Sequence, residues 1–383
     1  MILLLKNPLS ISDGLVLQSY EGYEKVRKMT MKHGKRLPMR YLTSATPKRV
    51  WQAMLTGKPY PIRALIVMAS NPLLTQADTK LVYKAIKELD LLVVSELFKT
   101  PTAMLADYIL PAAGVLERPV LETKAGVANI AYGGGQAVKP YYERRPDYYF
   151  LRELGLRLGQ EEDWPWEDYE TALAASLVPL DITWDEFCKT GLYSTENFYY
   201  KYEGMGKLGK PMGFATTSGK VELYSEFLKE IGEDPLPKPK KGLLPDEDYP
   251  LILITGARHQ PYYASSYHQI DRFRKLHPEP IVEMNEKTAE ALGLTENDSV
   301  YVETKKGRAI FKVKLIPMAD RVVSVEYGWW QPEFPAEEPE LGGIWRSNAN
   351  LLTFCEDETA GVETPPAIAP KGTPSIRHFP KLD

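Results

Sequence analysis

Two apolar runs of strand length, separated by a segment of helical periodicity, constrain this chain more than any other feature. The runs are 64–68 and 91–94, and a third short strand is predicted over 108–110, stopped by Pro111. We expect Thr75 to cap the intervening helix. The helix is indicated by apolar residues at helical spacing, namely Leu81, Val82, Ala85, Ile86 and Leu89. Strand, helix and strand in about thirty residues are typical of a βαβ unit with a parallel sheet.

A further helix is predicted to begin after Pro146, because Pro suits the first turn of a helix and Gly159 suits the position just past its end. Its apolar face consists of Phe150, Leu151, Leu154 and Leu158. With the three strands, this helix completes a predicted parallel α/β domain over residues 59–160.

The pattern changes after residue 249, where short strands follow one another with one small helix. Strands are predicted over 251–254, 300–302, 311–315 and 322–325, and the helix over 287–292. In 311–315 apolar residues alternate with Lys, so that one face of the strand is buried. Such a series is typical of a compact β-barrel, which we predict over 249–383.

The remaining segments show no clear core of their own. Residues 1–58 are interpreted as the remnant of a preceding domain, and residues 161–248, with their Gly- and Pro-rich stretches, as a connector. A length of 383 residues exceeds what one hydrophobic core usually serves. We therefore expect two domains plus connecting segments.

Composition argues against several classes of function. A net charge of -4 argues against nucleic-acid binding, which needs a clustered excess of Lys and Arg. Cys188 and Cys355 are far apart, so they form neither a disulfide framework nor a CxxC metal site. The apolar start at 1–5 is interrupted at Lys6, well short of a membrane span. We expect no direct membrane segment and favour a cytoplasmic location, with the periplasm as the alternative if a missing N-terminus carries an export signal.

Several sequence motifs, in a consistent order, resemble those of one protein family. TGKPYPIRALIVMASNPLL (56–74) and LDLLVVSELFKTPTAMLADYILPAA (89–113) resemble the third domain of molybdopterin oxidoreductases of the dimethyl sulfoxide reductase family. The C-terminal dinucleotide-binding barrel of that family resembles SGKVELYSE (218–226), ITGARHQPYYASSYHQI (254–270), VEMNEKTAEALGLTENDSVYVETKKG (282–307), YGWWQPE (327–333) and SNANLLT (347–353). The resemblance covers roughly residues 55–360 and favours the branch of acetylene hydratase-like and polysulfide, thiosulfate and arsenate reductase-like enzymes.

The resemblance implies a Rossmann-like parallel α/β domain followed by a double-psi-type β-barrel. It implies bis-molybdopterin guanine dinucleotide with molybdenum or tungsten as cofactor, and a four-iron four-sulfur cluster only in an N-terminal part that this chain lacks. Catalysis would need that portion, in the same chain or as a partner chain, and an iron–sulfur electron-transfer subunit is a further expected partner. The protein ligand of the metal would also lie in the missing part, so we expect no metal ligand here.

In the α/β domain the resemblance implies that Asn71, Glu96, Thr102 and Asp107 bind the cofactor. Asn71 follows the first strand, where open α/β sheets bind ligands, and its amide offers both a donor and an acceptor. Glu96 ends the second strand and suits ribose hydroxyls, while Asp107 suits guanine nitrogens. The alternatives are an Asn-Pro turn, an exposed loop carboxylate, a helix-capping Thr and a turn Asp.

In the barrel, Gly256 and Arg258 follow a predicted buried strand. A Gly allows close approach of the backbone to a diphosphate, and an Arg supplies a planar, bidentate positive charge. Ser265 and His268 occupy the next loop, where a hydroxyl and an imidazole suit phosphate or pterin oxygen atoms. The alternatives are a surface arginine and a structural histidine.

Trp329 and Asn350 complete the expected site, because they lie in the motifs that resemble the family's pterin contacts. Core packing for the Trp and a polar turn for the Asn are the alternatives.

The sequence leaves two alternatives to the cofactor-binding part of an enzyme. A non-catalytic module that binds the cofactor, or a structural subunit of a larger complex, would bind without turnover. A nicotinamide dehydrogenase is disfavoured, because the first strand is followed by ASNP and not by G-x-G-x-x-G.

Overall fold

The computed structural model describes residues 47–58, 60–123, 130–194, 213–214, 218–225, 229, 235–236, 245–355 and 375–376. Much of the predicted remnant 1–58, much of the connector 161–248 and most of the chain after residue 355 lie outside these ranges. The chain forms two compact units, and each is described by itself. Unit 1 comprises 1–45 and 112–239, and unit 2 comprises 46–111 and 240–383.

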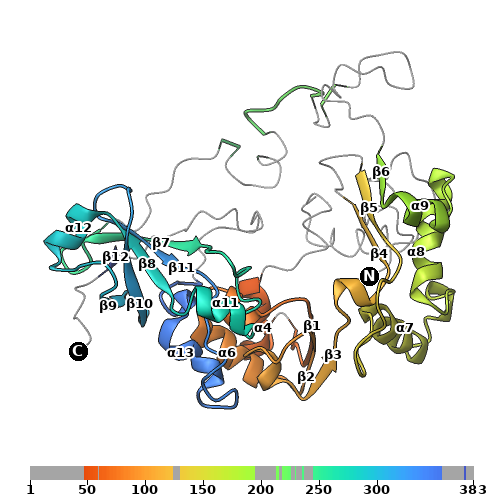
Figure 1. The fold of residues 1–383 in the computed structure, drawn as a ribbon, viewed down its shortest axis with the longest axis horizontal. Helices are drawn as coiled ribbons and strands as arrows, with labels where there is room; N and C mark the ends of the chain where they lie inside the picture. Colours follow the sequence, from red (N-terminus) through yellow and green to blue (C-terminus); the bar gives the residue numbers. More distant parts are fainter. Residues whose placement is uncertain are drawn as a thin grey trace. The chain divides into compact units, whose positions relative to one another are not determined.

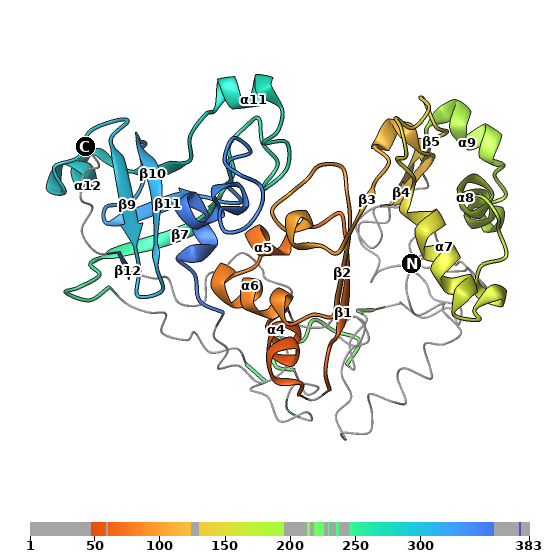
Figure 2. The same cartoon turned by 90° about the horizontal axis from the view of Figure 1, so that it is seen from below.

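Unit 2 begins with the predicted parallel sheet, which is confirmed. Its strands are β1 (Ala64–Met68), β2 (Leu91–Glu96) and β3 (Tyr108–Pro111), all parallel in the order β1-β2-β3. The helices α4 (Pro47–Thr56), α5 (Pro72–Thr75) and α6 (Thr79–Lys87) lie on one side of β1 and β2 (Figure 2). Residues Val67, Val82, Ile86 and Val94 are among those that fill the core between sheet and helices.

The expectation that Thr75 caps the helix was wrong. Thr75 is the last residue of α5, and its hydroxyl donates to the carbonyl oxygen of Asn71 at 2.9 Å. The cap of α6 is Asp78, whose carboxylate accepts from the backbone N–H of Leu81 at 3.2 Å. A short helix that begins at Pro72 therefore separates the strand from α6.

The C-terminal part of unit 2 is a curled, six-stranded mixed sheet of half-barrel form in the order β12-β7-β11-β8-β10-β9 (Figure 1). β11 pairs with β7 and β10 with β8 in parallel, while the other pairs are antiparallel. The predicted alternation in 311–315 is confirmed, because Phe311 and Val313 are buried in the core of this sheet. The strands are β7 (Leu251–Ala257), β8 (Ile281–Met284), β9 (Ser299–Glu303), β10 (Arg308–Leu315), β11 (Val322–Glu326) and β12 (Ser375–Ile376).

Short helices surround this sheet. They are α11 (Asp271–Leu276), α12 (Glu286–Ala291), η8 (Leu341–Gly343), α13 (Ile344–Ser347) and η9 (Ala349–Leu351). Trp330, Leu341 and Ile344 belong to the core that also contains α4 and α6. The half-barrel and the parallel sheet are therefore packed into one body.

Unit 1 is built on an antiparallel sheet of β4 (Val120–Thr123), β5 (Ile130–Gly134) and β6 (Leu192–Ser194). Its helices are η4 (Val115–Glu117), α7 (Asp147–Arg157), η5 (Glu161–Asp163), α8 (Tyr169–Leu177), η6 (Val178–Leu180) and α9 (Trp184–Thr190). Ala131, Leu173, Leu177, Trp184 and Phe187 form its core. The predicted helix after Pro146 is confirmed as α7, although it lies in this unit rather than with the parallel sheet. The boundaries 59–160, 161–248 and 249–383 stay predictions.

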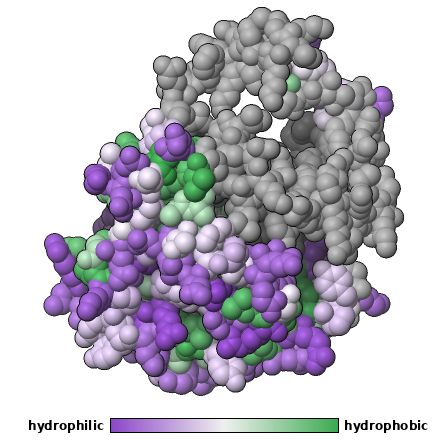
Figure 3. Space-filling view, turned by 90° about the vertical axis from the view of Figure 1, so that its right-hand side faces the viewer, coloured by the Kyte–Doolittle hydropathy of each residue, from purple (hydrophilic) through white to green (hydrophobic). Residues whose placement is uncertain are grey.

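The surface is mixed in character. Figure 3 shows one face on which hydrophobic residues gather in a few separate places among hydrophilic ones. In the described ranges, no helix has both the length and the apolar content that crossing a membrane requires.

Candidate cofactor-binding site

Asn71 is buried at the carboxyl end of β1, where it precedes the first turn of α5. Its Oδ1 accepts a hydrogen bond from the Thr102 hydroxyl at 2.6 Å, and that hydroxyl in turn accepts from the backbone N–H of Leu73 at 3.1 Å. The Nδ2 of Asn71 has no hydrogen-bond partner within the described part of the chain. Because burying an unpaired amide is costly, this N–H group is a donor available to a ligand.

Thr102 is fully buried, and both of its side-chain hydrogen bonds are to the segment around Asn71. The sequence places it thirty-one positions from Asn71, and the structure joins the two side chains. Thr102 therefore orients Asn71, and its own contact with a cofactor stays a prediction.

The two acidic candidates lie at opposite edges of the parallel sheet. Glu96 is half-buried at the carboxyl end of β2, on the same edge as Asn71, and its Oε1 accepts from the backbone N–H of Leu97 at 2.8 Å. Asp107 precedes β3 and is exposed at the amino edge, where its carboxylate accepts from the backbone N–H of Leu92 at 2.7 Å. The structure brings Glu96 to the side of Asn71 and does not bring Asp107 there.

Gly256 is the extra residue of a β-bulge in β7, since β11 pairs with Thr255 and then with Ala257. Its φ of 114° favours glycine. The bulge precedes Arg258, which is exposed and lies with its guanidinium 5.8 Å from the centre of the Tyr327 ring.

Tyr327 links Arg258 to α5. Its hydroxyl donates to the carbonyl oxygen of Thr75 at 2.9 Å, and the Thr75 hydroxyl bonds the backbone of Asn71. The two halves of the predicted site, one after β1 and one after β7, therefore meet at the four-residue helix α5.

The loop after β7 is held closely against the end of β11. A Cβ atom on Gly328 would lie 2.8 Å from the backbone carbon of Ala264 and from the backbone nitrogen of Ser265, so only glycine fits. Ser265 is buried, and its carbonyl oxygen accepts from Trp330 Nε1 at 2.9 Å.

His268 is almost completely buried in this loop. Its ring stacks on the Tyr262 ring with centres 4.1 Å apart, and it packs edge to face with the Trp329 ring with centres 4.9 Å apart. Its Nε2 lies 3.3 Å from the carbonyl oxygen of Ala264. Burial lowers the pKa of His268 to about 3, although that carbonyl opposes the change. The imidazole is therefore neutral at physiological pH.

Two further histidines, His277 and His259, lie next to this stack, and each is close to a carboxylate. The Nε2 of His277 lies 2.8 Å from the carboxylate of the buried Glu326. The centre of the His277 ring is 5.3 Å from the centre of the Trp329 ring. His259 lies 3.4 Å from Glu283. Burial lowers the pKa of His259, against the attraction of Glu326 and Glu283.

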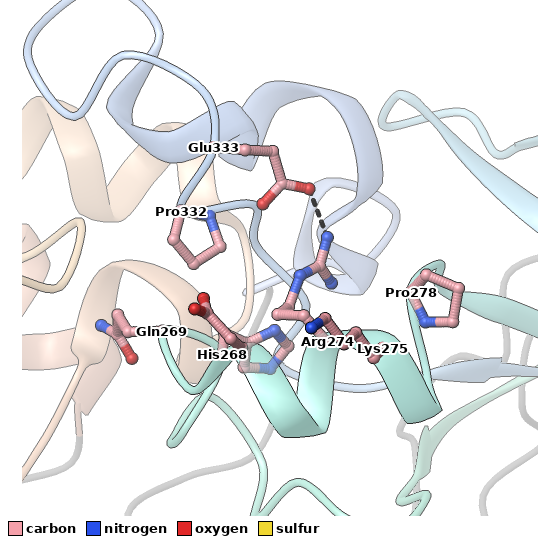
Figure 4. A pocket seen from close by; sticks show the side chains of 8 residues that line it. His268, Gln269, Arg274, Lys275, Pro278, Pro332 and Glu333 are labelled. Carbon is pink, nitrogen blue, oxygen red and sulfur yellow. Dashed lines mark hydrogen bonds and ion pairs between the residues drawn. The ribbon is translucent and has the colours of Figure 1, made fainter.

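A pocket of about 580 Å³ lies beside His268 (Figure 4). Its walls come from α11 with the loop before it and from the segment of Pro332 and Glu333, and an ion pair between Arg274 and Glu333 joins the two. Three of the lining residues carry buried polar atoms without a partner in the described ranges, namely Nδ1 of His268, Nε2 and Oε1 of Gln269 and Nη1 of Arg274.

These atoms test whether the residues suit a polar organic cofactor. Unpaired buried donors and acceptors are rare in proteins, and here four such atoms belong to residues that line one pocket. Gln269 offers both a donor and an acceptor, as the edge of a pterin or a guanine requires. The residues therefore fit such a group.

Gln269 and Arg274 were not among the residues predicted from the sequence. Gln269 directly follows a predicted site residue, which was the available signal. No pattern marks Arg274, because its burial comes from contact with Trp329, whose ring centre is 5.0 Å from the guanidinium.

Asn350 has a structural role in this fold. Its Nδ2 donates to the carbonyl oxygen of Leu74 at 2.6 Å, and its Oδ1 accepts from Thr353 at 3.1 Å. Asn348 similarly donates to the Thr79 hydroxyl at 2.8 Å. These bonds fasten the half-barrel to α5 and α6, and a cofactor contact by Asn350 stays a prediction. Among the described residues, no group of three or more His, Cys, Asp or Glu is placed to hold a metal ion.

Comparison with known proteins identifies the family. The molybdopterin oxidoreductase pattern matches residues 9–157, and the molybdopterin dinucleotide binding domain matches residues 251–369. Acetylene hydratase of Syntrophotalea acetylenica is 36% identical over 298 residues, which are 76% of this chain and 40% of that protein. The chain belongs to the molybdopterin oxidoreductase family.

Other members of the molybdopterin oxidoreductase family show the same partial coverage. The molybdopterin-containing subunit of thiosulfate reductase from Salmonella typhimurium is 28% identical over 69% of this chain and 37% of its own length. The structure of acetylene hydratase from Pelobacter acetylenicus matches with a TM-score of 0.75 and 34% identity, over 82% of this chain and 44% of that one. The chain thus spans about 40% of the length of these relatives.

Proposed function

We propose that this chain is the C-terminal part of a bis-molybdopterin guanine dinucleotide enzyme with molybdenum or tungsten, and that catalysis needs a further N-terminal portion. The observation that carries the proposal is the set of unpaired buried polar atoms around the pocket beside His268, together with the free Nδ2 of Asn71. Their position in the two matched family regions supports a dinucleotide cofactor as the missing partner of these atoms.

The bound cofactor would supply a metal held by dithiolene sulfurs that accepts or donates electrons. The chain's own residues would hold and orient it. Asn71 and Glu96 would bind the nucleotide at the carboxyl edge of the sheet, and Arg258 after the Gly256 bulge would neutralise the diphosphate. In the barrel loop, the neutral His268 would offer its ring nitrogen as a hydrogen-bonding group.

Further roles complete this proposal. Gln269 would pair with a pterin edge, Ser265 and Trp329 would shape the pocket, and Thr102 would keep Asn71 in position. A contact by Asn350 or Asp107 would need the cofactor to replace hydrogen bonds that these side chains already make. We further propose that the half-barrel is the visible part of a double-psi β-barrel, since its parallel and antiparallel pairs alternate along the curled sheet.

Metal and cofactor analysis tests the proposal. The purified chain, alone and together with the N-terminal portion of the enzyme from the same organism, would be assayed for iron, molybdenum, tungsten, pterin fluorescence and dye-linked turnover. We expect turnover and a stoichiometric cofactor only when both portions are present. Full cofactor and turnover in the chain alone would contradict the proposal.

Arg258→Ala provides the local test. Cofactor retention in the complete enzyme should fall, while the melting temperature of the cofactor-free chain should hardly change, because Arg258 is exposed. The matched control is Arg308→Ala, since Arg308 also stacks on a tyrosine, Tyr301 at 4.7 Å, on β9 and β10. Equal effects of the two substitutions would favour a purely structural arginine.

Two partners follow from the same proposal. The first is the N-terminal portion, and the second is an iron–sulfur subunit that exchanges electrons with the cluster expected there. Cofactor binding without turnover in the presence of the N-terminal portion would favour the alternative of a non-catalytic cofactor-binding subunit.

A further inference from the structure

Unit 1 exposes large side chains that its own core does not use. Val115 and Leu116 in η4, and Val138, Tyr141 and Tyr142 in the loop between β5 and α7, are between 50% and 86% exposed. We call these residues the tyrosine patch. Apolar surface of this kind, when it is contiguous, usually marks an interaction site.

Hydrogen bonds hold the two segments of the patch together. The backbone N–H groups of Ala137 and Val138 both donate to the carbonyl oxygen of Leu116 at 3.0 Å. The carboxylate of the buried Glu117 accepts from the backbone N–H of Tyr141 at 2.9 Å. The patch is therefore a preorganised surface, which lowers the entropy lost when a partner binds.

Tyr142 has the most unusual conformation in the patch. It is 86% exposed, and its φ of 52° lies in the left-handed region, which a residue with a Cβ rarely adopts. Its ring meets the edge of Tyr141 at 4.3 Å, and the Arg144 guanidinium lies 5.8 Å from the Tyr141 ring. Tyr142 thus presents an aromatic ring to solvent, and rigid aromatic anchors are the residues that dominate protein interfaces.

The relatives suggest what covers the patch. This chain spans about 40% of their length, so more than half of each relative lies outside the matched region. Apart from the ion pair between Glu117 and Arg144, the patch is flanked by Lys139 and Arg145 against Glu143. A partner with an apolar recess and an acidic rim would complement this arrangement.

We infer that the tyrosine patch is the docking surface for the N-terminal portion of the molybdopterin enzyme that this chain lacks. The inference rests on the proposed function and adds to it the surface through which the two portions join. Tyr142 enters a recess of that portion, Leu116 and Val138 cover apolar surface beside it, and Arg145 and Lys139 meet acidic groups at the rim.

A binding experiment with two kinds of variant tests the inference. The full chain would be titrated with the separately produced N-terminal portion from the same organism, and the Kd measured by calorimetry. Tyr142→Gly removes the ring and also relieves the left-handed strain, so the chain should fold at least as stably. Binding should nevertheless weaken by at least about ten-fold, as expected for a central aromatic anchor. Leu116→Asp should weaken binding as strongly.

The matched control is Leu158→Asp, because Leu158 is a large, 65% exposed residue of the same unit outside the patch. It should leave the Kd unchanged. Equal affinity of the wild-type chain and Tyr142→Gly would overturn the docking surface while leaving the proposed function intact. Failure of the wild-type chain to bind the N-terminal portion at all would overturn both. Self-association of the wild-type chain that Tyr142→Gly abolishes, measured by sedimentation, would identify a second copy as the occupant and refute the inference.

Discussion

The burial of His268 makes a quantitative prediction about stability and pH. Its pKa is about 3 in the folded chain, compared with the usual 6.5. The unfolded chain therefore binds a proton at a higher pH than the folded chain does, so that the contribution of His268 to stability is complete above pH 6.5 and is lost as the pH falls below it. At pH 5 this amounts to a loss of about 2 kcal/mol in the free energy of unfolding.

Denaturant unfolding of the cofactor-free chain measures this loss. Circular dichroism would follow unfolding of the wild-type chain, His268→Gln and Trp329→Phe at pH 7.5 and at pH 5. His268→Gln removes the titrating ring, so its stability should fall less between the two pH values, by about 2 kcal/mol. Trp329→Phe disturbs the same stack without removing a titrating group and should keep the full pH dependence. His259 titrates in all three proteins and therefore cancels in the comparison.

Equal losses in the free energy of unfolding of the wild-type chain and His268→Gln between pH 7.5 and pH 5 would contradict a buried, neutral His268. A direct measurement is available through imidazole NMR with ¹³C-labelled histidine. The His268 signals should stay at their neutral positions down to pH 5, and a midpoint near 6.5 would show that the ring is solvated.

Three substitutions test the frame around the site. Gly328→Ala should lower the free energy of unfolding by about 2 kcal/mol or more, because its Cβ would collide with the backbone of Ala264; unchanged melting would contradict this close approach. Thr102→Val should lower the free energy of unfolding, measured with denaturant, by about 1–3 kcal/mol. Thr102→Ser, which keeps the hydroxyl, should lower it clearly less. Asn350→Leu should cost about 1–3 kcal/mol by leaving the carbonyl oxygen of Leu74 unpaired, and hydrogen exchange should rise in α5 and η9; unchanged exchange would argue against this fastening.

Elements whose signal is local could be predicted from the sequence. The parallel strands β1 to β3, helix α7 and the alternating strand β10 all appear where run length and periodicity placed them. The helices α8 and α9 were missed, although Thr183 and Glu186 form a capping box at the start of α9. The structure identifies both helices, whose apolar residues pack with β5 in the core around Phe187. Family membership was likewise predictable, because several motifs in a consistent order are more specific than a single motif.

The candidate site shows where sequence reasoning stops. Asn71 and Glu96 could be placed at strand ends from the sequence alone, because parallel strands put their carboxyl ends at one edge. Only the tertiary structure showed that the Asn350 amide bonds the carbonyl oxygen of Leu74, and that Arg274 and Gln269 contribute unpaired atoms to the pocket. Which strand end a residue occupies follows from local pattern and parallel pairing. Whether its polar atoms are paired, and therefore free for a ligand, depends on neighbours distant in sequence that only the folded chain brings into contact.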